Sequence, residues 1–184
     1  LEGKTAHAGE PENGINPAIG MTHLIIQMNK LSNYKSLFKD FVLITPIHAR
    51  LGNIAYGTSP GEAEIHFTLR SYLNEDMDLI LQKAEHIVID ISSNENLKSI
   101  ISYKEMFPAT KNLIECTGVT NQSRKSLGLD AEFLKQPFKW SEDFGYFTRE
   151  FKGALFGLGA GANQPALHNP DFDFPDDLIE QGVK

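Results

Sequence analysis

A strict alternation of polar and apolar residues runs through Glu62-Ala63-Glu64-Ile65-His66-Phe67-Thr68-Leu69-Arg70. Successive side chains of a β-strand point to opposite faces, so the apolar residues share one face and the charged and polar residues share the other. The stretch therefore predicts a strand with one buried face and one face that is wet or functional.

Helices are predicted on both sides of this strand. Asn16-Pro17 begins the first, because Asn caps helices well and Pro is favoured in the first helical position. The second is expected to be capped near Asn74. Apolar residues recur at intervals of three and four in both segments, at Met21, Leu24, Ile25, Met28 and Leu31, and at Met77, Ile80, Leu81, Ala84, Ile87, Val88 and Ile91.

Three further strands are predicted around these elements, over residues 1–8, 41–49 and 99–107. Pro46 interrupts the second of them, which indicates an edge or a bulge. The resulting order, β-α-β-β-α-β, predicts an α+β ferredoxin-like fold, in which two helices cover one face of an antiparallel sheet. Leu1-Glu2-Gly3 has the character of a strand's end, so we expect the first strand to be truncated.

The sequence changes character after about residue 108. Helices are predicted over residues 112–127, from Ser141-Glu142-Asp143 and from near Pro175, and a short apolar strand over residues 154–158. We expect exposed apolar surface around Leu155, Phe156 and Leu158, because nothing in the sequence supplies sheet partners for them.

Composition narrows the possible functions. Hydrophobic residues make up 41% of the 184 residues and charged residues 22%, as in a folded protein. With 17 Lys and Arg against 24 Asp and Glu, the net charge of −7 argues against a nucleic-acid partner. No apolar run approaches the roughly 20 residues of a membrane span. Cys116, the one cysteine, excludes an internal disulfide and fits a reducing compartment, so we expect a cytoplasmic protein.

Two of the six histidines are candidates for function. His7 and His168 lie in irregular segments rich in Gly, Asn and Pro, where binding and catalytic groups concentrate. His48 and His66 lie on neighbouring predicted strands, and the simplest interpretation is a cross-strand pair. A purely structural role for His7 and His168 stays open at this point.

Four blocks of sequence follow one another in a characteristic order. They are 3–11 with 14–18, 55–70, 141–144 and 158–170. The first reads Gly3-Lys4-Thr5-Ala6-His7-Ala8-Gly9-Glu10-Pro11, and the last contains Leu167-His168-Asn169-Pro170. Together they resemble the zinc-dependent aminoacylase and carboxypeptidase superfamily, which includes hippurate hydrolases, desuccinylases and dipeptidases.

The resemblance implies a particular organisation. Residues 1–109 would be the ferredoxin-like lid, or dimerisation, domain, and residues 110–184 the C-terminal part of a split α/β zinc-exopeptidase-like catalytic domain. The chain would then be a fragment of a longer homodimeric hydrolase. That enzyme would cleave the amide bond of an N-acyl amino acid or short peptide bearing a carboxylate, with water activated by two divalent metal ions, zinc above all.

The resemblance also implies roles for individual residues. His7 would stabilise the substrate's oxyanion across the dimer, Arg70 would bind the substrate carboxylate, and His168 would be a metal ligand. Glu142 and Asp143 would support the metal site. Gly57 stands where the family has a substrate-binding asparagine, and this departure predicts an unusual substrate.

One histidine cannot hold a catalytic zinc ion, which needs about three protein ligands. We therefore expect this chain alone to be inactive. The alternative is a non-catalytic dimerisation or binding module. A small-molecule sensor is a third possibility, supported by fold analogy alone.

Overall fold

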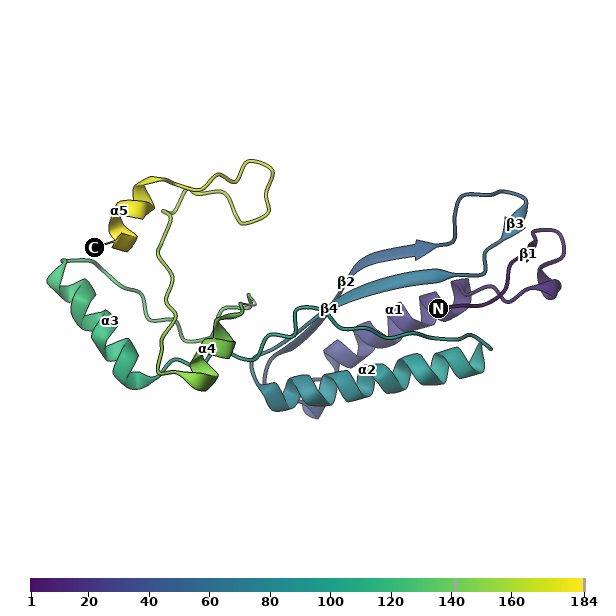
Figure 1. The fold of residues 1–184 in the computed structure, drawn as a ribbon, viewed down its shortest axis with the longest axis horizontal. Helices are drawn as coiled ribbons and strands as arrows, with labels where there is room; N and C mark the ends of the chain where they lie inside the picture. The colour runs from purple at the N-terminus through teal and green to yellow at the C-terminus, as the bar shows by residue number, and fades with distance from the viewer. Residues whose placement is uncertain (141, 184) are drawn as a thin grey trace. The chain divides into compact units, whose positions relative to one another are not determined.

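A computed structural model describes residues 1–140 and 142–183, which form two compact units (Figure 1). The first unit consists of Leu1–Ala109 and Gln136–Ser141. The second consists of Thr110–Lys135 and Glu142–Lys184. The capping hydroxyl predicted at Ser141 lies outside the described residues.

The first unit combines two long helices with two small antiparallel sheets. One sheet pairs β2 (Val42–Leu51) with β4 (Ala63–Ser71), and the other pairs the short strands β1 (Ala6–His7) and β3 (Thr58–Ser59). Both helices lie on the same side of the β2–β4 ribbon (Figure 1). Its elements are β1 (Ala6–His7), the 3-10 helix η1 (Pro11–Asn13), α1 (Ala18–Asn33), η2 (Lys35–Leu37), β2 (Val42–Leu51), β3 (Thr58–Ser59), β4 (Ala63–Ser71) and α2 (Asn74–Asn94).

The core of the first unit lies between the helices and the β2–β4 ribbon. Ile80 of α2 is completely buried at its centre. The alternation in β4 is confirmed, because Ala63 is buried, Ile65, Phe67 and Leu69 pack against the core, and Glu64 and His66 are exposed. The other buried members of the core cluster are Leu24, Met28, Leu31, Phe38, Ile44 and Ala84.

Pro46 does mark a bulge. The register of β2 against β4 shifts between Pro46 and His48, so that Pro46 lies opposite Phe67 and His48 opposite His66. Proline lacks an N–H to donate to a strand ladder, and a bulge is one of the few places in a sheet that tolerates it.

The strand predicted over residues 99–107 is not present, and this prediction was wrong. Lys98 forms a single bridge with Glu2, and residues 99–107 form no ladder. A strand needs a neighbour to exchange hydrogen bonds with, and the pairing of Lys98 with Glu2 does not continue into residues 99–107. The sheets observed are therefore two-stranded, and four strands do not join in one sheet.

Both predicted asparagine caps differ in detail from the expectation. Asn16 Oδ1 accepts a hydrogen bond from the N–H of Ala18 (2.9 Å), which is the first residue of α1. Asn74 is itself the first residue of α2, and its Oδ1 accepts from the N–H of Ala109 (2.9 Å). The side chain of Asn74 thus holds a distant segment instead of capping its own helix.

The described residues of the second unit form three helices, α3 (Ile114–Ser126), α4 (Phe144–Glu150) and α5 (Asp177–Val183). Its described residues form no strand, so the strand predicted over residues 154–158 was wrong. Asn112 instead brackets Leu155, donating to its carbonyl at 2.7 Å and accepting from its N–H at 2.8 Å.

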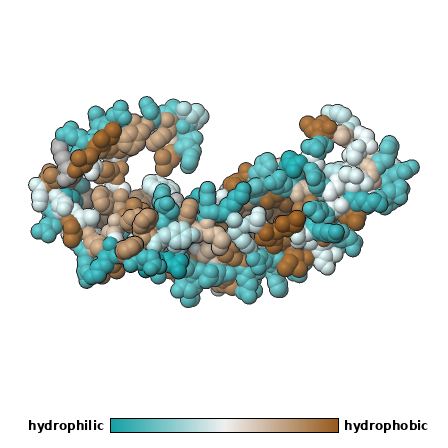
Figure 2. Space-filling view, in the orientation of Figure 1, coloured by the Kyte–Doolittle hydropathy of each residue, from teal (hydrophilic) through white to brown (hydrophobic). Residues whose placement is uncertain are grey.

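Apolar side chains remain at the surface of the second unit (Figure 2). Gly145 is the one buried residue among those described there. Leu155, Phe156 and Leu158 are all exposed, which confirms the expectation of apolar surface at this segment.

Candidate functional site

His7 lies in the small β1–β3 sheet, directly opposite Thr58. The N–H of Ala8 donates to the carbonyl of Gly57 at 3.0 Å, so the two segments stay paired beyond the strands. The N–H of Gly9 donates to His7 Nδ1 at 3.0 Å. Because Nδ1 acts as acceptor, the neutral ring carries its proton on Nε2. His7 is exposed and can therefore donate from Nε2 to a ligand.

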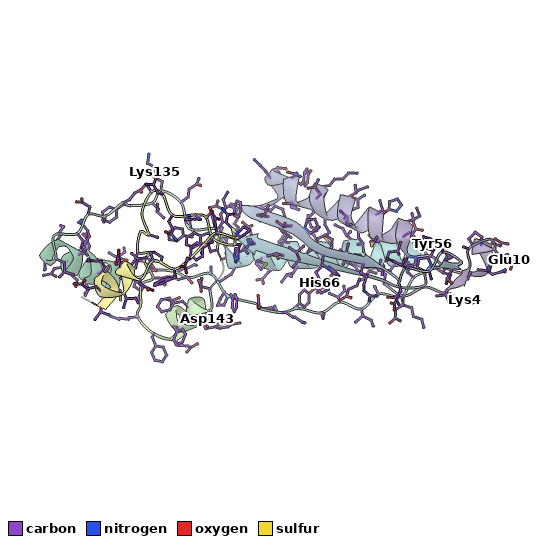
Figure 3. The ribbon with its side chains drawn as sticks, turned by 90° about the horizontal axis from the view of Figure 1, so that it is seen from above. Lys4, Glu10, Tyr56, His66, Lys135 and Asp143 are labelled. Carbon is purple, nitrogen blue, oxygen red and sulfur yellow. The ribbon has the colours of Figure 1, made fainter. Side chains whose placement is uncertain are left out.

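Around the β1–β3 sheet, backbone segments approach one another closely at two glycines. A Cβ on Gly3 would lie 2.1 Å from the carbonyl oxygen of Ile15, and one on Gly61 would lie 2.5 Å from the amide nitrogen of Thr5. Glycine is thus the residue that lets these segments touch. Lys4, Glu10 and Tyr56 lie at the same end of the unit (Figure 3).

Gly57 differs from Gly3 and Gly61, because a Cβ added at Gly57 would have no heavy atom within 4 Å. Neither space nor a left-handed backbone requires glycine there. The structure therefore brings His7 and Gly57 together, as two of the predicted site residues, and leaves room for a side chain at Gly57.

Arg70 lies near the other end of β4. Its Nη1 donates to the carbonyl of Lys139 at 2.9 Å, and Tyr72, two residues further along, donates its hydroxyl to the carbonyl of Pro137 at 3.1 Å. Lys139 Nζ lies 5.1 Å from the centroid of the Phe41 ring, a cation–π contact. Sequence reasoning missed these contacts, because residues 69 positions apart carry no periodic signal of their proximity.

The strand length separates Arg70 from the other two predicted substrate-binding residues. β4 has 9 residues, with Arg70 next to its last position. At about 3.3 Å per residue, the ends of such a strand are roughly 25 Å apart. His7 and Gly57 lie beyond the beginning of β4, at the opposite end of the unit (Figure 1). Within one copy of the chain, His7 and Arg70 do not share a site.

The remaining predicted site residues belong to the second unit. His168 is exposed and has a positive φ of 69°, in a turn between Gly161 and Phe172. Glu142 and Asp143 directly precede α4, and the carbonyl of Asp143 accepts from the N–H of Tyr146 at 2.9 Å.

No three His, Cys, Asp or Glu side chains among residues 1–140 and 142–183 are grouped so that they could hold a metal ion. A catalytic zinc ion takes about three protein ligands. The side chains that the structure describes therefore do not by themselves fit a catalytic metal.

A charged cluster occupies the exposed face of the β2–β4 ribbon. The rings of His48 and His66 face each other edge to face, with centroids 5.3 Å apart, as the cross-strand pairing predicts. Glu64 accepts from His66 Nε2 (2.7 Å) and from Arg50 (3.4 Å), and these hydrogen bonds lower the pKa of the Glu64 carboxyl. Arg50 also reaches Glu62, at 3.1 Å.

Within the described residues, none of the helices has both the length and the apolar character that crossing a membrane would require.

Residues 1–96 match the sequence profile of the peptidase dimerisation domain family. Hippurate hydrolase of Campylobacter jejuni is 25% identical over 98% of this chain and 47% of its own length. N-acetyldiaminopimelate deacetylase of Bacillus velezensis is 24% identical over 100% of this chain and 48% of its own. The chain thus spans about half the length of the curated relatives it matches.

Solved structures share the fold. An aminobenzoyl-glutamate utilization protein from Klebsiella pneumoniae superposes with a TM-score of 0.68 at 14% identity, over 80% of this chain and 37% of its own. An aminopeptidase from Bacillus cereus does so with a TM-score of 0.62 at 19% identity, over 80% of this chain and 38% of its own.

Proposed function

Because the chain belongs to the peptidase dimerisation domain family, we propose that it is part of a homodimeric hydrolase that cleaves amide bonds of N-acyl amino acids or short peptides. The observation that carries this proposal is the family match over residues 1–96, extended by relatives that align with the whole chain. Those relatives are named as hydrolases and deacetylases.

The two units have different parts in this proposal. Residues 1–109 are the lid, or dimerisation, domain, with ferredoxin-like topology once its first strand is complete. Residues 110–184 are the C-terminal part of a split catalytic α/β domain. Supporting this is the near absence of buried residues in the described part of the second unit, as expected of a domain fragment.

His7 is the proposed oxyanion donor, reaching the active site of the partner copy. Its exposed Nε2–H suits that role, because a donor aimed at developing negative charge contributes about 3 kcal/mol to transition-state stabilisation. The bond from Gly9 to Nδ1 holds the ring in the required tautomer.

Arg70 is the proposed partner of the substrate carboxylate. Its guanidinium has a planar fork of donors that matches a carboxylate. Since His7 and Arg70 lie at opposite ends of one unit, a substrate that touches both takes them from two copies. A symmetric dimer can meet this requirement if the end of one copy that carries His7 lies beside the end of the other copy that carries Arg70.

The proposed cofactors are two divalent metal ions, with zinc the favoured metal. His168 would supply one ligand and Glu142 and Asp143 would support the site, while the other ligands would come from residues outside this chain. This chain by itself is then inactive. The single Cys116 fits a cytoplasmic location.

The first test is made on material purified from the native source. Intact mass and metal content are measured, and hydrolysis is assayed with N-acetyl and N-benzoyl amino acids and dipeptides, with and without a chelator. We expect a longer or two-piece hydrolase, about two divalent ions per subunit and chelator-sensitive cleavage. If only the 20.5 kDa chain is found, with dimers but no cleavage, the non-catalytic dimerisation module is the correct alternative.

The arrangement of His7 and Arg70 is tested by mixing inactive copies of the whole enzyme. His7→Ala and Arg70→Ala are each expected to abolish most activity. If one site uses His7 of one copy and Arg70 of the other, equal mixing and subunit exchange restore about one quarter of the sites. No restoration would show that both residues act within one copy.

A further inference from the structure

Two histidines lie directly opposite each other on the exposed face of the β2–β4 ribbon. His48 of β2 pairs with His66 of β4, directly after the register shift that follows Pro46. Both side chains are exposed, and their ring centroids are 5.3 Å apart; Figure 3 labels His66. The antiparallel pairing of the strands therefore holds two imidazole rings side by side at the surface.

The spacing of these rings suits a shared metal ion. At a zinc–nitrogen distance of about 2.0–2.1 Å, two imidazoles in a tetrahedral site have ring centres roughly 5.2 Å apart. The observed separation of 5.3 Å lies close to this value. Rotation about the Cβ–Cγ bond leaves a ring centre almost in place. Each ring can therefore turn one nitrogen toward a common ion while the strands stay fixed.

Glu64 prepares His66 for binding a metal. Its Oε1 lies 2.7 Å from His66 Nε2, and its Oε2 accepts from Arg50 at 3.4 Å. These hydrogen bonds lower the pKa of the Glu64 carboxyl, which is ionised near neutral pH and can only accept. Neutral His66 therefore carries its proton on Nε2 and a lone pair on Nδ1. A carboxylate on the second ring nitrogen is the usual outer partner of a metal-binding histidine.

The charges around the ring pair favour a cation. Arg50 contributes one positive charge, whereas Glu62 and Glu64, both paired with it, contribute two negative charges. Imidazole nitrogen is a good ligand for zinc, copper and nickel, while magnesium and calcium prefer oxygen ligands. The chemistry of the pair therefore selects a divalent ion from the end of the first transition row.

We propose that His48 and His66 together bind one divalent ion of this class, Zn²⁺ or Cu²⁺, through one nitrogen of each ring, with water completing the coordination. On β4 the binding atom is Nδ1 of His66, because Nε2 is bonded to Glu64. The ion would link β2 to β4 just beyond the bulge. Because it binds the folded ribbon, it would also raise the thermal stability of the first unit.

This proposed site is separate from the one proposed for hydrolysis. Its residues are not among the residues predicted to bind or support the catalytic metal ions, which are His168, Glu142 and Asp143. Two protein ligands also agree with the finding that residues 1–140 and 142–183 contain no group of three His, Cys, Asp or Glu side chains able to hold a metal. The inference therefore does not depend on the proposed enzymatic activity.

Calorimetric titration of the chain with ZnCl₂, in a buffer that does not coordinate metal, tests the proposal. We expect His48→Gln and His66→Gln each to weaken zinc binding by about tenfold or more, because losing even an outer partner of a metal ligand costs ten- to a hundredfold. The double variant should lose little more than either single one, since one remaining imidazole cannot chelate. CuCl₂ should bind the same two residues more tightly than ZnCl₂.

The matched control is His86→Gln, which removes an exposed histidine from α2 and should leave the zinc affinity unchanged. Glu64→Gln should weaken binding less than His66→Gln, because an uncharged amide oxygen accepts from Nε2–H less strongly than a carboxylate. All these positions are exposed, so circular dichroism should show the same fold in every variant. In ¹⁵N NMR, zinc should shift Nδ1 of His66 and one ring nitrogen of His48.

Three results would overturn the proposal. Unchanged zinc affinity in His48→Gln and His66→Gln would remove the pair as a ligand. An equal loss of affinity in His86→Gln would show that zinc binds the histidines of the chain without selection. One zinc ion per two chains, with dimers forming on its addition, would make the histidines a bridge between copies instead of a link between β2 and β4.

Discussion

Both units contain many large apolar side chains but use them differently. In the first unit, leucine, isoleucine, methionine and phenylalanine from both helices and the ribbon converge on Ile80. In the second, Phe151, Phe156 and their apolar neighbours stay exposed, and the unit depends on polar ties such as Asn112 with Leu155. Helices form in both units, but a core requires elements whose apolar faces meet.

The strongest test of this contrast truncates one large side chain in each unit. Ile80→Ala is expected to lower the free energy of unfolding by about 2–5 kcal/mol, because it opens a cavity at a fully buried position. Phe151→Ala, 71% exposed, is expected to change it by no more than about 0.5 kcal/mol. Urea denaturation followed by circular dichroism measures both.

Ile89→Ala is the matched control, since Ile89 is in the same helix but 57% exposed. It separates the loss of packing from the change in helix propensity. An equal effect of Ile80→Ala and Phe151→Ala would break the comparison between the units.

A buried carboxylate provides the second test. Asp76, in the first turn of α2, accepts hydrogen bonds from the N–H groups of Lys39 (3.0 Å) and Asp40 (2.9 Å). Asp76→Asn keeps one oxygen acceptor but places an NH2 group against the second backbone N–H, so that donor loses its partner. We expect the free energy of unfolding to fall by about 1–3 kcal/mol, as measured by thermal or urea denaturation.

Glu75→Gln removes a charge from the same helical turn without touching these bonds, because Glu75 is exposed. It measures the helix-dipole contribution alone, about 0.3–1 kcal/mol. If the two variants lose the same amount, the bonds to Lys39 and Asp40 do not matter and Asp76 acts only through its charge.

A third test addresses the polar ties of the second unit. Asn112→Ala removes both hydrogen bonds to Leu155. We expect proteolytic cleavage and amide exchange around residues 153–155 to increase, at a cost of about 0.5–1.5 kcal/mol per bond. The unfolding of the first unit should not change.

Lys152→Ala supplies the control. It breaks the exposed ion pair with Glu115 (2.9 Å), and exposed pairs contribute about 0–1 kcal/mol. If Lys152→Ala increases proteolytic cleavage and amide exchange around residues 153–155 as much as Asn112→Ala does, the hydrogen bonds between Asn112 and Leu155 have no special role. The second unit would then respond in the same way to any substitution near this segment.

The smallest effect concerns pH on the exposed face of the ribbon. Hydrogen bonds from His66 and Arg50 lower the pKa of Glu64. Its stabilising contribution is therefore present above the ordinary glutamate pKa of about 4.3 and is lost as the pH falls through the lower value of the folded protein.

We expect Glu64→Gln to make the unfolding midpoint less sensitive to pH across this acid range, with the slope measured by thermal denaturation. Glu12→Gln, at the exposed turn η1, should leave the slope unchanged. A steeper slope in Glu64→Gln would contradict the sign of the shift.

Local patterns in the sequence were sufficient for most elements of the first unit. The alternation through β4, the helical stripes of α1 and α2 and the bulge at Pro46 follow from periodicity and backbone chemistry, which act between near neighbours. The placement of His7 beside Gly57 was not accessible in this way. It depends on Gly3 and Gly61 meeting distant backbone.

The same limit explains the incorrect predictions. Residues 99–107 and 154–158 have sequences suited to strands, but a strand exists only with a partner to bond, and neither has one among the described residues. Asn74 is a residue type that often caps helices, yet its side-chain oxygen accepts a hydrogen bond from the N–H of Ala109 instead. A local preference of a few tenths of a kcal/mol to about 1 kcal/mol gives way to such long-range contacts.

The sequence by itself determined the element types of the first unit, its buried strand face, and the family resemblance carried by the segments around His7 and His168. Only the tertiary structure decided that His7 and Arg70 lie at opposite ends of one unit, that Arg70 holds the Lys139 carbonyl, and that Leu1 and Glu2 are bonded on both sides. The reason is physical: periodicity records which face of an element is buried, whereas the partner across that face is chosen by the packing of the whole chain.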